Sequence, residues 1–149
     1  MKVKDAGPRH DGGFVSLVTQ LYKALNRRTG EDILGMRFKP YMTLGYIRDH
    51  PGTSQQELES ALFMDANMVV LILNELEAAQ FSLRRRDPSD RRRHIVEITP
   101  AGRRALEKAD KARDTIEDDV LGPLSAEERK SLRRLLERVL DGLFSEARA

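Results

Sequence analysis

Two short helical patterns, separated by only two residues, occupy positions 54–80, and an arginine-rich segment follows them directly. The first begins with Ser54 and Glu57 in a capping box, where the hydroxyl and the carboxylate are each expected to accept a backbone N–H. The second begins at Asp65, a favourable N-cap. Because only Phe63 and Met64 lie between them, the chain must turn a sharp helix-turn-helix corner. The inner face of the second helix is marked by Val69, Ile72, Leu73 and Leu76.

The segment that follows, residues 83–99, has the pattern of a β-hairpin. Two extended flanks surround a turn that contains Pro88, Ser89 and Asp90. A helix-turn-helix followed by a basic hairpin is a winged helix, an architecture that mostly binds duplex DNA. We therefore predict a mainly α fold with a small β-hairpin wing, in which a winged helix lobe is joined to a helical dimerisation layer.

The positive charge of the chain is concentrated on and just after this hairpin. From Arg84 to Arg104 there are eight arginines and three acids, which gives +5, whereas the rest has 18 bases and 21 acids, or −3. Such an asymmetry is typical of a surface that binds a polyanion. The alternative is a solvated, charge-rich hairpin without a partner.

The remaining sequence predicts helices on both sides of this lobe. Residues 1–13 are expected to form a flexible arm, followed by a helix over 14–28, a connector over 33–38 and a helix over 40–49. Thr99 and Ser125 are expected to cap two further helices, which end near Val120 and the C-terminus. The predicted organisation is an arm (1–13), dimerisation helices (14–36 and 100–149) and a winged helix lobe (37–99).

The first and last helices both carry apolar stripes that the lobe does not need for its own core. They could pack against each other within one subunit, or interdigitate with a second subunit in a C2 homodimer. We favour the homodimer, because the winged helix already has a buried face of its own. The predicted interface consists of Leu17, Leu21, Leu132, Leu136, Val139, Leu140, Leu143 and Phe144.

Several other classes of function are not supported by the sequence. Without cysteine there is no disulfide and no thiolate metal site, and His10, His50 and His94 share no metal-ligand spacing. No catalytic triad or phosphate-binding glycine loop is present, so we expect neither an enzyme nor a cofactor. No apolar run approaches the roughly 20 residues of a membrane span, and no signal core precedes the first helix, so we expect a cytoplasmic protein.

The segment from Asp87 to Gly102 resembles the wing signature of MarR-type transcriptional regulators, and residues 50–58 and 73–77 extend the resemblance upstream. The likeness covers essentially the whole chain. It implies a homodimer on a pseudo-palindromic operator, with the second helix of the motif in the major groove and the wing in the adjacent minor groove. By position, Arg92 matches the family's minor-groove arginine, and Asp90 matches the acid that steadies the wing.

The resemblance also implies the other DNA contacts. Arg84, Arg85, Arg91 and Arg93 would contact phosphates. Ser54 and Gln55, at the start of the first helix, complete the predicted DNA-contacting set outside the recognition helix.

The outward face of the recognition helix departs from the family pattern. Asn67 and Asn74 can hydrogen-bond base edges, adenine being the natural partner of asparagine, and Val70 and Leu71 can touch thymine methyl groups. Glu75 would be repelled by DNA unless a wing arginine neutralises it. The glycine expected after the helix is replaced by Gln80. Either DNA binding is retained with an unusual dependence on the wing and on apolar contacts, or the chain is a protein-interaction module that has lost operator recognition.

The resemblance also implies that the protein binds a small aromatic effector. Family members often bind aromatic acids where the dimer layer meets the lobes, and they often act as repressors through operator occlusion. The alternative for aromatic residues at helical spacing is an ordinary core. The candidate lining residues are Tyr22, Phe38, Tyr41, Met42, Tyr46 and His50.

Overall fold

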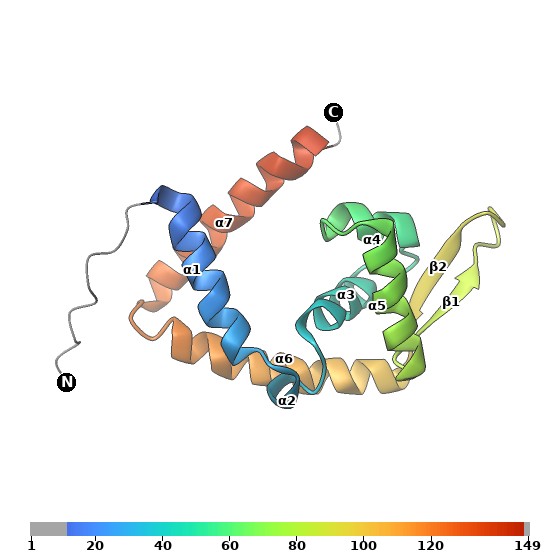
Figure 1. The fold of residues 1–149 in the computed structure, drawn as a ribbon, viewed down its shortest axis with the longest axis horizontal. Coiled ribbons are helices and arrows are strands. Elements are labelled where there is room, and N and C mark those ends of the chain that lie inside the picture. Colours follow the sequence, from blue (N-terminus) through green and yellow to red (C-terminus); the bar gives the residue numbers. More distant parts are fainter. Residues whose placement is uncertain (1–11, 148–149) are drawn as a thin grey trace.

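The computed structural model describes residues 12–147, so most of the predicted N-terminal arm, and with it His10, lies outside the described residues. As predicted, the fold is mainly helical with one two-stranded sheet. In Figure 1 the long helix α6 runs along the base of the molecule, from the wing to α1 and α7 at the other end. The elements are α1 (Gly13–Arg28), α2 (Glu31–Leu34), α3 (Phe38–Asp49), α4 (Gln55–Ala61), α5 (Ala66–Ala78), β1 (Ser82–Arg86), β2 (His94–Ile98), α6 (Pro100–Val120) and α7 (Ala126–Ala147).

The predicted helix caps Ser54, Asp65 and Thr99 are confirmed, with one correction. The Asp65 carboxylate accepts a hydrogen bond from the N–H of Met68 (2.8 Å), and the Thr99 hydroxyl accepts one from the N–H of Gly102 (3.0 Å). The Ser54 hydroxyl likewise accepts from the N–H of Glu57 (3.2 Å). The reciprocal half of this capping box is absent, because the Glu57 carboxylate accepts from the Thr53 hydroxyl (2.8 Å) instead of a backbone N–H.

Two features of the segment before the lobe differ from the prediction. The short helix α2 was not predicted; it overlaps the start of the expected connector, and its Leu34 is buried. Helix α3 begins at Phe38, two residues before the predicted start at Pro40. Proline is tolerated there because the first N–H groups of a helix have no partner within it.

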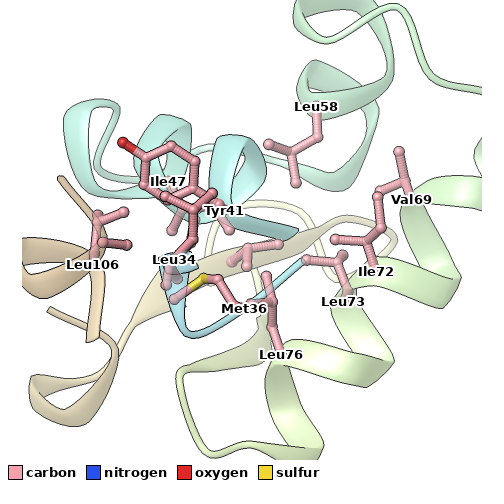
Figure 2. Packing of buried hydrophobic residues seen from close by; sticks show 13 residues of the cluster. Leu34, Met36, Tyr41, Ile47, Leu58, Val69, Ile72, Leu73, Leu76 and Leu106 are labelled. Carbon is pink, nitrogen blue, oxygen red and sulfur yellow. The ribbon is translucent and has the colours of Figure 1, made fainter. Parts of the chain in front are cut away.

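The hydrophobic core lies inside the winged helix lobe and against α6 (Figure 2). The predicted inner face of α5 is confirmed, since all four of its apolar residues are buried. Burial of such side chains supplies the main stabilisation of the lobe, at roughly 1.5–3 kcal/mol for each. The buried cluster comprises Leu34, Met36, Tyr41, Leu44, Ile47, Leu58, Val69, Ile72, Leu73, Leu76, Val96, Leu106 and Ala109.

The wing is a regular antiparallel hairpin fixed to the helix-turn-helix. Its register pairs Ser82 with Ile98 and Arg86 with His94. Val96 is buried, and its N–H donates to the carbonyl oxygen of Thr53 (3.0 Å), just before α4. The base of the wing therefore has a fixed position relative to α4 and α5.

Two turns of the lobe have left-handed backbone at non-glycine residues. Gln80 (φ 64°) adopts, after α5, the conformation that the expected glycine would supply. Phe63 (φ 50°) adopts it at the helix-turn-helix corner, where its ring stacks on that of Phe144 of α7 at 4.8 Å between centroids. The corner and the last helix therefore touch within one chain.

The terminal helices leave their apolar stripes largely uncovered in the single chain. No residue of α1 is buried, and Leu17 is 58% exposed and Leu21 43% exposed. On α7, Leu136, Val139, Leu140 and Leu143 are between 41% and 49% exposed. Packing of the two helices within one subunit therefore does not bury these stripes.

Within residues 12–147, no helix combines the length and apolar character needed to cross a membrane.

Candidate nucleic-acid interface

The outward face of α5 lies where the sequence predicts it. Asn67, Val70, Leu71 and Asn74 are all exposed, opposite the buried face of the helix. Leu71 is the most prominent apolar side chain, with 63% of its surface exposed. This face therefore offers two amide groups and two aliphatic side chains to a partner.

Glu75 on the same helix is neutralised, but not by the wing. Arg37, the residue that precedes α3, donates to both carboxylate oxygens, with Nε 3.0 Å from Oε1. These hydrogen bonds are the largest cause of the lowered pKa of Glu75. The partner that neutralises Glu75 is therefore Arg37 and not an arginine of the wing.

Arg84 on β1 is directed toward α5. Its Nε donates to Glu77 Oε1 (2.7 Å), and its Nη2 donates to Glu77 Oε2 (3.0 Å) and to Asn74 Oδ1 (2.6 Å). The hydrogen bond from Arg84 is also the largest cause of the lowered pKa of Glu77. Three of the five guanidinium N–H donors are therefore engaged within the protein.

The other hairpin arginines fall into two groups. Arg85 pairs with Glu97 (2.6 Å) and Arg93 with Glu57 (3.5 Å). The side chains of Arg86, Arg91 and Arg92 are exposed and form no hydrogen bond or ion pair with residues 12–147. Arg86 is not among the predicted DNA contacts, although its place two residues after Arg84 on the same strand puts it on the same face of the hairpin.

The tip of the wing is a turn held by its two aspartates. The Asp90 carboxylate accepts from the N–H of Arg92 (3.0 Å), a contact that suits the predicted steadying role. The Asp87 carboxylate accepts from the N–H (2.9 Å) and the hydroxyl (2.6 Å) of Ser89, and its pKa is lowered mainly by that hydroxyl. The backbone that carries Arg91 and Arg92 is therefore defined.

A cleft of about 240 Å³ separates the start of α4 from the wing. Ser54 is almost fully buried there, and its hydroxyl caps α4, whereas the half-exposed Gln55 lies at the edge of the cleft. The arrangement brings predicted contacts of α4 and of the wing to one place. The lining residues are Ser54, Gln55, Gln56, Glu59, Arg92, Arg93 and His94.

The six candidate effector residues lie in different environments. Tyr41 belongs to the core, with Phe38 beside it at 6.2 Å between ring centroids, so the core alternative holds for Tyr41. Tyr46 stacks on His50 at 3.8 Å between ring centroids. Tyr22 on α1 and Met42 on α3 are 54% and 40% exposed.

The Tyr41 hydroxyl takes part in a polar network between α3 and α6. It donates to the Asp110 carboxylate (2.5 Å) and accepts from Arg113 (3.0 Å). Burial, followed by the hydrogen bond to Asp110, raises the pKa of Tyr41 to about 12. Arg48 donates to the other Asp110 oxygen at 2.7 Å.

Residues 40–94 match the sequence profile of the MarR family. The chain is 35% identical over 99 residues to a putative transcriptional regulatory protein for the hcr operon of Thauera aromatica, covering 66% of this chain and 60% of that one. It is 34% identical over 101 residues to the HTH-type transcriptional repressor NicR of Pseudomonas putida, covering 68% and 64%. The chain thus spans less than two thirds of the length of either relative.

Solved structures share the fold across nearly the whole chain. A crystal structure of MarR superposes with a TM-score of 0.84 at 24% identity, covering 94% of this chain and 97% of that one. A structure of BpsR from Bordetella bronchiseptica superposes with a TM-score of 0.78 at 25% identity, covering 91% of this chain and 99% of that one. That structure concerns the regulation of DNA binding by 6-hydroxynicotinic acid.

Proposed function

Because the chain belongs to the MarR family, we propose that it is a sequence-specific, DNA-binding transcriptional regulator. The observation that carries this proposal is that the side chains of Arg86, Arg91 and Arg92 have no partner among residues 12–147, on a hairpin whose other arginines pair with carboxylates. Three uncompensated guanidinium groups beside an exposed helix face match the charge of a DNA backbone.

The proposed contacts follow from these positions. Helix α5 enters the major groove with Asn67, Val70, Leu71 and Asn74, and Arg92 enters the narrow minor groove, whose negative potential suits a planar guanidinium. Arg91, Arg93 and Arg85 contact phosphates together with Gln55, and Arg86 joins this group. Ser54 is left out, because it is buried and its hydroxyl caps α4. Arg84 is assigned instead to the support of α5, because its hydrogen bonds are directed there.

We further propose a homodimer on a pseudo-palindromic operator, with residues 14–36 and 100–149 as the dimerisation layer and 37–99 as the lobe. The exposed stripes of α1 and α7 support this, because apolar faces of this extent are normally covered. The contacts would include Leu132 and the exposed Leu136, Val139, Leu140 and Leu143 of α7. Phe144, the remaining predicted contact, stacks on Phe63 of its own chain.

We propose that the chain is a repressor controlled by an effector, by analogy with its relatives. One is named a repressor, and the DNA binding of BpsR is described as regulated by an aromatic acid. Operator occlusion relieved by an aromatic effector is the corresponding mechanism here, and the chain has no catalytic role in it. The candidate effector contacts are Tyr22, Phe38, Met42, Tyr46 and His50.

We also propose that the protein acts in the cytoplasm, because its proposed target is DNA.

The first experiment is a binding titration of the full-length protein against duplex DNA from its own upstream region and against an unrelated duplex of equal length. We expect tighter binding to the upstream fragment. Equal binding to both fragments, together with no enrichment from a pool of random duplexes, would refute a sequence-specific regulator.

A protein-interaction module is the second candidate, because Leu71 and Phe63 expose apolar surface on the helix-turn-helix (63% and 62%). Mass in solution separates the two candidates. A species with the mass of one subunit at micromolar concentration, combined with the absence of DNA binding, would favour the interaction module.

A further inference from the structure

We propose that Arg84 is a positioning residue that makes Asn74 read a keto base, guanine or thymine, instead of adenine. The inference rests on the proposed function, since it concerns which base α5 selects. It reverses the expectation, drawn from the side chain alone, that adenine is the partner of Asn74.

The orientation of the Asn74 amide follows from the chemistry of its neighbour. Arg84 Nη2 lies 2.6 Å from Asn74 Oδ1. A guanidinium has only donors, so the amide atom that faces it must be the oxygen. The usual ambiguity between the oxygen and nitrogen of an asparagine side chain is therefore resolved here by the partner.

Arg84 is itself held in place. Two hydrogen bonds to the Glu77 carboxylate, at 2.7 Å and 3.0 Å, fix the plane of the guanidinium from the same helix that carries Asn74. The lowered pKa of Glu77 keeps this carboxylate ionised at neutral pH. Glu77, Arg84 and Asn74 thus form a three-residue support between β1 and the outward face of α5.

This support determines what Asn74 can offer to a base. Asparagine reads adenine with both ends of its amide, accepting from N6 and donating to N7. With Oδ1 already bound to a cationic donor, an adenine N6–H would have to approach the same oxygen beside the positive charge. The Nδ2 hydrogens remain available to donate.

The donors of Nδ2 match only some base edges in the major groove. Guanine presents two acceptors, O6 and N7, and thymine presents O4. The N4 amino group of cytosine is a donor, so it offers no partner to Nδ2. Adenine N7 also accepts, but the adjacent N6 amino group would need the amide oxygen that is already bound to Arg84, so a keto base is the edge that the Arg84-bound amide favours.

The test is selection from a pool of random duplexes by the wild type and four variants. Asn74→Ala identifies the operator position that Asn74 reads, because the base preference at that position should disappear in this variant. Arg84→Met removes the donors but keeps a similar apolar stem. Arg37→Met is the matched control, because Arg37 holds Glu75 on the same helix without touching Asn74.

We expect the wild type to enrich guanine or thymine at the Asn74 position. In Arg84→Met the ratio of adenine to keto bases there should rise by about tenfold, as expected for recovery of a bidentate contact. Arg37→Met should leave that position unchanged. The fourth variant, Asn74→Asp, retains a partner for Arg84 and should shift the position toward cytosine, whose N4 donates to a carboxylate.

Three results would overturn the inference while leaving the proposed function intact. They are adenine at the Asn74 position in the wild type, the same base in wild type and Arg84→Met, and no position affected by Asn74→Ala. Absence of any enrichment by the wild type would instead refute the proposed function, and the inference with it.

Discussion

Glycine is required at position 102, in the first turn of α6, because the backbone at Phe81 comes too close for a side chain. A Cβ atom at this position would lie 2.1 Å from the carbonyl oxygen of Phe81. That oxygen accepts from the N–H of Thr99 (3.0 Å), so it cannot move away without loss of the hydrogen bond that joins the end of the wing to α6.

We predict that Gly102→Ala lowers the free energy of unfolding by about 3 kcal/mol, the upper end of the usual cost of overpacking. The matched control is Gly45→Ala in α3, where a Cβ meets nothing within 4 Å. That change should raise stability by up to about 1 kcal/mol through helix propensity. Urea unfolding at one fixed protein concentration measures both, and equal effects of the two changes would contradict the role of the Phe81 contact.

Single residues also set the limit of what the sequence could predict about the interface. The caps at Asp65 and Thr99 were predictable because cap and partner are three residues apart. The bond from Arg37 to Glu75 spans 38 residues and depends on how α3 packs against α5, so no local pattern signals it. The same holds for the difference between Arg84 and Arg92, which look alike in the arginine-rich segment but have different neighbours.

At the scale of elements, α3 and α6 are joined by the network around Asp110. Burial raises the pKa of Asp110, but hydrogen bonds from Tyr41 and Arg48 and the charges of Arg113 and Arg48 outweigh burial, so its pKa is lowered. A carboxylate whose pKa is lower in the folded state stabilises the protein above its unfolded pKa. That contribution disappears as the pH falls through the folded value.

We predict that Asp110→Asn destabilises the protein at pH 7 by about 2 kcal/mol, the usual range for hydrogen bonds to a charged group. The difference from wild type should shrink as the pH falls below about 4, the usual pKa of aspartate. Asp114→Asn is the control, because Asp114 contacts Arg113 but is 63% exposed. An Asp110→Asn effect that is independent of pH would show that the carboxylate charge does not matter.

The elements themselves were largely predictable, with informative exceptions. The inner face of α5 and the hairpin followed from periodicity and turn residues, which act locally. Helix α2 was not predicted, because four residues are too few for a periodic signal, and it owes its place to the buried Leu34. The partner of Glu57 was missed because the Thr53 hydroxyl competes with a backbone N–H for the same carboxylate.

At the scale of the molecule, the 21 residues of α6 span about 31 Å at 1.5 Å per residue, from the base of the wing to the turn before α7. DNA-binding dimers commonly engage half-sites about 34 Å apart, one turn of the duplex. A dimer formed through α1 and α7 would therefore fix the spacing of its two lobes through α6.

The proposed dimer predicts a change of mass on disruption of the α7 stripe. Leu136→Glu, which places a charge at a side chain that is 41% exposed in the single chain, should yield a species with the mass of one subunit in sedimentation velocity at micromolar concentration. Arg134→Glu introduces the same side chain on the charged side of α7 and should remain dimeric. Retention of the dimer by Leu136→Glu would argue against this helix as the interface.

The central claim is that the wing arginines bind DNA, and a salt titration tests it most directly. Binding to the upstream duplex is measured over a range of salt concentrations for the wild type, for Arg92→Ala, and for Lys111→Ala, which removes an exposed charge in the middle of α6. Release of counterions makes the logarithm of the affinity fall linearly with the logarithm of the salt concentration. Loss of Arg92 should weaken binding and reduce this slope by about one for each lobe. Lys111→Ala should leave the slope unchanged. A slope and an affinity that are the same in Arg92→Ala and the wild type would contradict the account.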